Sequence, residues 1–242
     1  MKLFLFALVY STLLNFASAQ APTLDINGAS AGGYGQVKFN NAAAIGQKSN
    51  DKLDYSEVRG KYFWQEEWNP AILILNAGKS YKVRKAKLNF YTSDVIYIDN
   101  NLSELAAQTG LVKKIVFFST SDTARVIGAF IQLARKSADG KEHFYQLLND
   151  GKIQLLKSTT VTLRKGTYDP MVGKDQYSFN STYDYFISNS GIISPLKSIS
   201  KSSIISTLNL DDSDNKWLTS NKNKLKNETD VVSFLNYLNN QK

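Results

Sequence analysis

Residues 143–164 read HFYQLLNDGKIQLLKSTTVTLR and give the clearest indication of the fold. Two runs rich in apolar, aromatic and β-branched residues flank Asp150-Gly151, and such runs bounded by turn residues are typical of β-strands. The Asp-Gly pair readily adopts the positive φ angles that a tight type I′ turn requires. The stretch therefore predicts a β-hairpin that turns at Asp150-Gly151.

Similar runs continue on both sides of this hairpin. Five earlier ones occupy residues 71–76, 80–92, 94–99, 111–118 and 126–133. Residues 183–188 and 191–197 predict a further hairpin about Asn189-Ser190, and Pro195, which cannot donate to a ladder, places its strand at a sheet edge. Short strands joined by successive turns predict an antiparallel β-domain over residues 59–197, built as a meander, sandwich or open barrel.

The C-terminal segment, residues 198–242, has helical periodicity instead. Val231, Phe234, Leu235 and Leu238 follow the i, i+3, i+4, i+7 pattern of a helix with one apolar face. Three groups of N-cap residue types predict three short helices: Ser198, then Asp211–Ser213, then Asn227 or Thr229. The predicted class is therefore α+β, mainly β, with the C-terminal helices packed on the β-domain.

The first nineteen residues have the three parts of a secretory signal peptide. Lys2 is a basic start, residues 3–14 are almost wholly apolar, and Ala17-Ser18-Ala19 is an A-x-A cleavage site. The apolar run is shorter than the roughly 20 residues that span a bilayer. We expect export to the periplasm or the extracellular space, with peripheral attachment to the outer membrane as one alternative. Residues 20–58, rich in Gly, Ala and Asn, predict a flexible leader.

Composition excludes several classes of protein. The 242 residues include no cysteine and one histidine, so a disulfide scaffold and the usual zinc and copper sites are excluded, and we expect no cofactor. The net charge of +8 favours anionic partners or serves solubility alone, and we expect the latter.

The basic run at residues 79–87 is followed by Phe90 and Tyr91, a mixture that can bind single-stranded nucleic acid. A better explanation of the basic run is that its lysines protect an exposed edge strand from pairing with other chains. We therefore expect no nucleic-acid partner.

The catalytic motifs in the chain lack their context. Gly28-Ala-Ser30-Ala-Gly32 matches the G-x-S-x-G nucleophile elbow, but the motif requires a strand-to-helix turn within an α/β sheet. His143, the one available base, is expected to be a surface residue at a strand edge. Asp211–Asp214 resembles a calcium loop without its glycine or distal glutamate, and helix capping explains it better. The sequence therefore predicts no catalytic residue, no metal site and no enzyme activity.

The most concentrated aromatic segment is Tyr62–Trp68, which reads YFWQEEW. If the segment is extended, Trp64, Glu66 and Trp68 share one face, where two indoles and a carboxylate could bind a sugar ring or a lipid. The alternative, which we favour, is that the tryptophans pack into the core and Glu66 lies at its rim.

Several dispersed segments resemble a family of uncharacterised exported proteins from Bacteroidota. The matching pieces are Gly60–Tyr62, Gly78–Tyr81, Leu88–Tyr91, Phe144–Leu148, Gly151-Lys152, Leu155–Lys157, Tyr183–Phe186 and Asn236-Tyr237. The resemblance covers most of the chain after residue 59. It implies a bacterial envelope location and supplies no catalytic residue.

Two functions follow as hypotheses. The first is a non-catalytic exported protein that acts through surface contacts with envelope components. The second is a glycan- or lipid-binding module that uses Trp64, Glu66 and Trp68 as its ligand-binding face.

Overall fold

The computed structural model describes residues 23–25, 40–41, 58–99, 102–107, 110–136, 142–171, 173–210, 212–221 and 224–241. The predicted signal peptide and the Gly28–Gly32 motif lie outside the described residues. Of the predicted leader, the structure describes two short strands and Val58. The expectation that the leader is flexible therefore stays a prediction.

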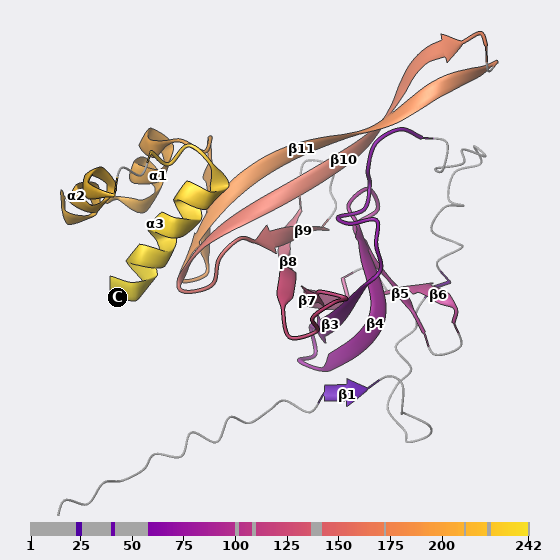
Figure 1. The fold of residues 1–242 in the computed structure, drawn as a ribbon, viewed down its shortest axis with the longest axis horizontal. Coiled ribbons are helices and arrows are strands. Elements are labelled where there is room, and N and C mark those ends of the chain that lie inside the picture. The colour runs from indigo at the N-terminus through magenta and orange to yellow at the C-terminus, as the bar shows by residue number, and fades with distance from the viewer. Residues whose placement is uncertain are drawn as a thin grey trace, which may run out of the picture.

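Within the described residues, twelve strands form one sheet (Figure 1). They are β1 (Thr23–Asp25), β2 (Asn40–Asn41), β3 (Asn69–Leu75), β4 (Ser80–Asn89), β5 (Asp94–Ile98), β6 (Glu104–Ala106), β7 (Val112–Phe118), β8 (Val126–Lys136), β9 (Glu142–Leu147), β10 (Ile153–Asp169), β11 (Lys174–Asn189) and β12 (Ile192–Leu196). From β3 to β12 every pairing is antiparallel, and the sheet is open. The predicted mainly-β class with packed C-terminal helices is confirmed.

Two meanders make up ten strands of this sheet, while β1 pairs in parallel with β4 and β2 pairs with β6. Strands β3 to β6 pair in chain order, strands β7 to β12 do the same, and β7 pairs with β3 to join the two. Strand β12, which carries Pro195, is the last in the order, so its predicted edge position is confirmed. The basic strand β4 has β3 on one side and, on the other, β1 beside Ser80–Lys82 and β5 beside Ala86–Asn89, so the prediction that it is an edge strand was wrong.

The first apolar cluster, here called the sheet core, lies against one face of the sheet. Strand β3 alternates strictly between buried and half-buried residues, so Ala71, Leu73 and Leu75 all face this core. Ile115 and Phe130 pack into it from β7 and β8. The opposite face of β3 carries the half-buried residues of the alternation.

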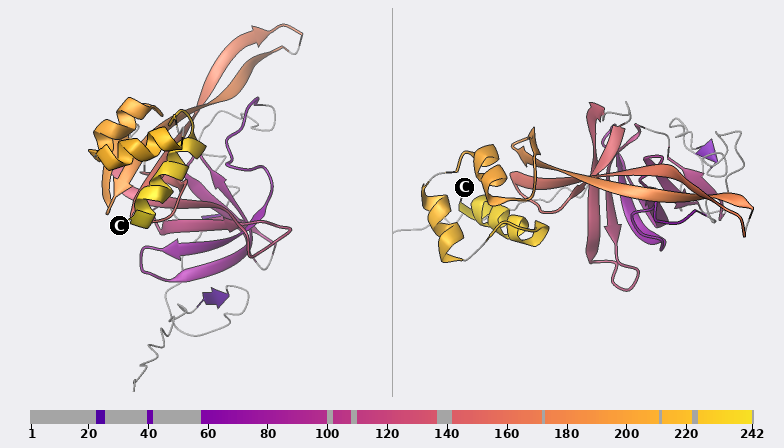
Figure 2. Two further views of the ribbon diagram at one scale, coloured as in Figure 1. Left: turned by 60° about the vertical axis from the view of Figure 1, so that its left-hand side comes forward. Right: turned by 90° about the horizontal axis from the view of Figure 1, so that it is seen from above.

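Strands β10 and β11 form the longest pair, of 17 and 16 residues, here called the ribbon. Figures 1 and 2 show it running from the helices past the rest of the sheet to a free tip. The predicted strands at 152–164 and 183–188 cover only the part of the ribbon nearer the helices. In the distal part residues 164–168 of β10 are all exposed, whereas Tyr177 and Phe179 of β11 still pack on the sheet core.

The turn at Asp150-Gly151 differs from the type I′ turn that the sequence predicts. The strand pairing starts at Leu147 and Leu156, and of the two described turn residues only Gly151 has a positive φ, of 113°. Asn149 replaces the missing ladder bonds, since its Nδ2 donates to the Ile153 carbonyl (2.9 Å) and its Oδ1 accepts from the Leu155 amide (2.7 Å). The type I′ signature occurs at the β11–β12 hairpin, where Ser190 (53°) and Gly191 (85°) both have positive φ.

Three helices follow the sheet: α1 (Lys201–Leu208), α2 (Asp212–Ser220) and α3 (Glu228–Gln241). The N-cap of α1 is Ser200 rather than Ser198, whereas Asn227 accepts from the Asp230 amide (2.8 Å) and caps α3. The buried residues of α3 are the four that the sequence predicts: Val231, Phe234, Leu235 and Leu238. No described helix is both long and apolar enough to cross a membrane.

The helices and the near end of the ribbon enclose a second cluster, here called the helix core. Ile153, Leu155 and Ile187 of the ribbon contribute to it together with the apolar face of α3. A polar junction lies beside it: Glu228 accepts hydrogen bonds from Lys157 Nζ (2.8 Å) and Tyr185 Oη (2.6 Å). Burial alone raises the pKa of Glu228, but these two hydrogen bonds and the Lys157 charge outweigh it and hold the pKa below its ordinary value.

Glu228→Gln is expected to lower the free energy of unfolding at pH 7 by about 0.5–1 kcal/mol, a small value because the pair is partly solvated. The folded carboxyl has the lower pKa, so its stabilisation is present at neutral pH and is lost as the pH falls below about 4. Urea titrations of both proteins between pH 7 and pH 3 should therefore converge at low pH. Glu67→Gln, which removes an exposed carboxylate, is the control, and a Glu228→Gln difference that persists unchanged at pH 3 contradicts the prediction.

Candidate functional site

The segment that contains Trp64, Glu66 and Trp68 bends at residues 64, 66 and 67 and is not a strand. Trp64 packs against the sheet core, with ring centroids 4.9 Å from Phe117 and 5.0 Å from Phe130. A Cβ at Gly128 would clash with the Trp64 ring, so this glycine makes room for the indole. The structure therefore places Trp64 in a packing role.

Trp68 and Glu66 lie apart from that cluster. Trp68 is half-buried and lies against the ammonium of Lys87, which is 4.9 Å from its ring and 4.9 Å from that of Phe63. Glu66 is exposed. Because the segment bends, the shared strand face that the hypothesis of an aromatic platform requires is not formed by these three residues.

His143 is buried, at 3% exposure, where the sequence predicted a surface residue, and this prediction was wrong. Its Nδ1 lies 3.1 Å from the Oγ of Ser93, which is 6% exposed and occupies the β4–β5 turn with a φ of 60°. The two residues are 50 positions apart, and nothing in their local sequence indicates that they meet.

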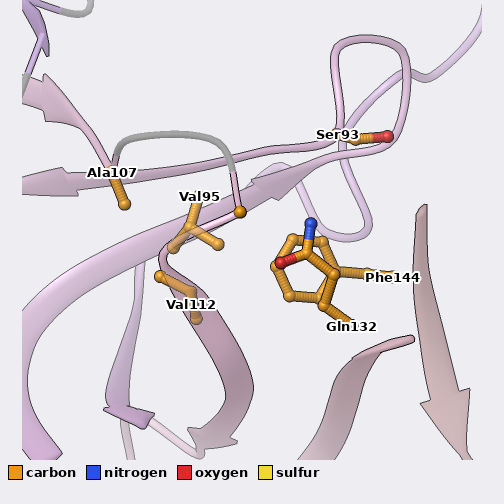
Figure 3. Close-up of a pocket in the computed structure, with 7 residues that line it drawn as sticks. Ser93, Val95, Ala107, Val112, Gln132 and Phe144 are labelled. Atoms are coloured by element: carbon orange, nitrogen blue, oxygen red, sulfur yellow. The ribbon is translucent and has the colours of Figure 1, made fainter. Parts of the chain in front are cut away.

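A small cavity lies beside this Ser–His pair. Figure 3 shows Gln132 and Phe144 reaching toward Val95 and Val112 across it, with Ser93 on the adjoining turn. Its volume of about 10 Å³ holds about one water molecule. A nucleophile and its base need room for a substrate, so the geometry supports a structural contact that fixes the β4–β5 turn to β9.

A larger hollow is a groove on the other face of the sheet, here called the β3–β4 groove, with a volume of about 500 Å³. Its wall comprises Pro70, Ala71, Ile72, Lys82, Val83, Arg84, Phe118 and Thr123. They come from β3, from β4, from the end of β7 and from the loop before β8. A volume of this size is typical of sites for small ligands.

A β-bulge explains how the groove obtains its charge. The β3–β4 register shifts between Asn69 and Ala71, so β4 has one extra residue there. As a result Val83 and Ala86 both face the sheet core although they are three residues apart, and the two residues between them, Arg84 and Lys85, are both exposed. Strand alternation places Lys82 on the same outer face as Arg84.

The groove combines an apolar wall with cations. Pro70, Ile72 and Phe118 are half-buried, whereas Lys82 and Arg84 are exposed. Strand β1 pairs with β4 beside the groove and places Asp25 opposite Lys82. No carboxylate lines the described wall, and Thr123 supplies its one side-chain hydroxyl. Such a wall can hold an apolar body and attract an anion, while it offers no nucleophile–base pair.

Sequence reasoning missed this groove. Its residues lie on three strands and a loop, and the basic run at 79–87 was assigned to edge protection. The signal that could have identified it is the spacing of Val83 and Ala86, which breaks the two-residue period and indicates a bulge.

Metal ligands do not gather in the described part of the chain, where no group of three or more His, Asp or Glu side chains could hold an ion. No family model matches the chain, no curated protein matches it, and no solved structure matches it.

Proposed function

We propose that the protein is an exported, non-catalytic binding protein that holds a small, largely apolar ligand in the β3–β4 groove. The observation that carries the proposal is the groove itself, a hollow of about 500 Å³ with apolar residues on its wall. Its export is supported by the signal-peptide pattern of residues 1–19. This role replaces the Trp64–Trp68 face with another surface of the same domain while retaining lipid among the ligand classes.

Filling the groove with a bulky side chain tests the proposal. Thr123 is exposed in a turn closed by the Asp122 carbonyl and carboxylate, so Thr123→Trp adds an indole beside the groove without entering either core. The exported chain is expected to bind the uncharged fluorescent probe N-phenyl-1-naphthylamine, and Thr123→Trp is expected to weaken binding by about tenfold, the effect of roughly 1.4 kcal/mol.

The matched control is Thr182→Trp, the same substitution at an exposed position of the ribbon. It should leave the probe affinity unchanged. Equal affinity of all three proteins for the probe, or no binding to any of them, would refute the groove as the binding site.

A second candidate function is contact with another envelope component through the ribbon tip. The observation that favours it is exposure: Met171 is 95% and Tyr168 is 60% exposed at the end farthest from both cores. A cellular defect caused by Met171→Asp but not by Thr123→Trp would assign the function to the tip rather than to the groove.

A further inference from the structure

The side chains of the groove wall indicate more about the ligand than that it is largely apolar. Lys82 and Arg84 lie two residues apart on one face of β4, a separation of about 7 Å along the strand. The two cations therefore flank one position at the groove wall. Arginine presents a fork of donors that matches a carboxylate or a phosphate, and lysine adds a second charge.

The opposite wall of the groove is apolar and continues across the sheet. Ile72 lies opposite Lys82 on one side and opposite Val116 on the other, and Val116 lies opposite Ala129 of β8. Cross-strand partners share a face, and all three apolar residues are half-buried. From β4 to β8 this row crosses three strand spacings, a length of about 14 Å.

One end of the row is cationic and the rest is apolar. An extended alkyl chain of about a dozen carbons has a comparable length, and a single chain fits the width of one row of side chains. A chain with an anionic end would place its charge between Lys82 and Arg84 and its methylenes against Ile72, Val116 and Phe118. Neither a free inorganic anion nor an uncharged chain would use both parts.

We propose that the ligand of the β3–β4 groove is a single-chain amphiphile with an anionic oxygen head group, a carboxylate or a phosphate monoester, held by Lys82 and Arg84. This inference rests on the proposed function, since it names the ligand class of the same groove. The two head groups share their charge and their acceptor oxygens, and the experiment separates them.

Calorimetric titration of the exported chain with dodecanoate, dodecyl phosphate, dodecanol and dodecyltrimethylammonium, all kept monomeric, tests the head group. Both anions are expected to bind, the alcohol about tenfold more weakly and the cation more weakly still, as solvated ion pairs of modest strength predict. Decanoate should bind about 4- to 15-fold more weakly than dodecanoate, because two methylenes leave the apolar row. The ratio of dodecyl phosphate to dodecanoate affinity identifies the preferred head group.

The double variant Lys82→Gln/Arg84→Gln should lower the affinity for the anions to that for dodecanol. Both side chains are exposed, so the change leaves the two cores intact. The matched control is Lys201→Gln/Lys216→Gln, which removes the same charge from exposed positions of α1 and α2 and should change nothing.

Each failure has its own signature. Dodecanol that binds as tightly as dodecanoate, with no loss in the Lys82→Gln/Arg84→Gln variant, overturns the head-group inference and leaves the proposed function standing. Inorganic phosphate that displaces dodecyl phosphate at equal concentration overturns the amphiphile and shows a simple anion site. Binding to phosphatidylglycerol vesicles without binding to any monomeric chain overturns it in favour of a membrane surface. If neither the amphiphiles nor N-phenyl-1-naphthylamine bind, the proposed function fails as well.

Discussion

Phe130→Ala is expected to lower the free energy of unfolding by about 3–5 kcal/mol, the usual cost of removing a buried phenyl ring. Phe130 is fully buried in β8, and its ring meets those of Trp64, Phe90 and Phe117 with centroids 5.0–6.0 Å apart. The loss therefore includes aromatic edge contacts as well as the cavity left behind. Urea denaturation followed by circular dichroism measures it.

Trp64 provides a second readout of the same change. Its indole packs on Phe130, so the Phe130→Ala cavity should admit water and shift the tryptophan emission to longer wavelength. Ile192→Ala is the control, because Ile192 is 74% exposed on the edge strand β12 and its loss should cost under about 0.5 kcal/mol. A Phe130→Ala protein with unchanged stability and emission would show that Trp64 does not depend on the sheet core.

The sequence predicted most elements because their patterns are local. Strand runs bounded by turn residues located β3 to β5 and β7 to β9, and the stripe of α3 named its four buried residues. The sequence did not predict the distal ribbon, because β10 beyond Leu163 is exposed and lacks the apolar alternation that marks a half-buried strand. The order of strands is non-local, because β7 pairs with β3 rather than with its sequence neighbour β6.

The candidate site was harder to predict from the sequence, because it too depends on contacts between distant segments. Adjacency of Trp64 and Trp68 in the sequence suggested a common face, but a bent segment sends one indole into the sheet core and the other over Lys87. Conversely Ser93 and His143, and the residues of the β3–β4 groove, meet only through the pairing of strands far apart in the chain. Composition limits which side-chain chemistries the chain can use, and the pairing of strands far apart in the sequence decides which of those side chains meet.

Phe234→Ala is expected to cost about 3–5 kcal/mol in the helix core, and to do so without disturbing the sheet core. Phe234 is fully buried on α3, and its ring lies 5.6 Å from that of Trp217. The two cores share no residue, and the ribbon connects them through Ile153 and Leu155 at one end and Val161 and Phe179 further along. Damage to the helix core can therefore reach the sheet core along the ribbon and along β9, where Phe144 lies in the sheet core and Leu148, which follows the strand, packs on the helix core.

The expected result is that unfolding of the Phe234→Ala protein separates into two steps. The helical signal at 222 nm and the Trp217 emission should be lost first, and the Trp64 emission should follow at the denaturant concentration of the parent protein. Trp64→Phe and Trp217→Phe backgrounds assign each emission to its core, with Trp68 constant in both. The β3–β4 groove lies beside the sheet core, so binding of N-phenyl-1-naphthylamine should survive the first step. Coincident loss of both signals, with probe binding lost at the same concentration, would show instead that the ribbon couples the two cores into one cooperative unit.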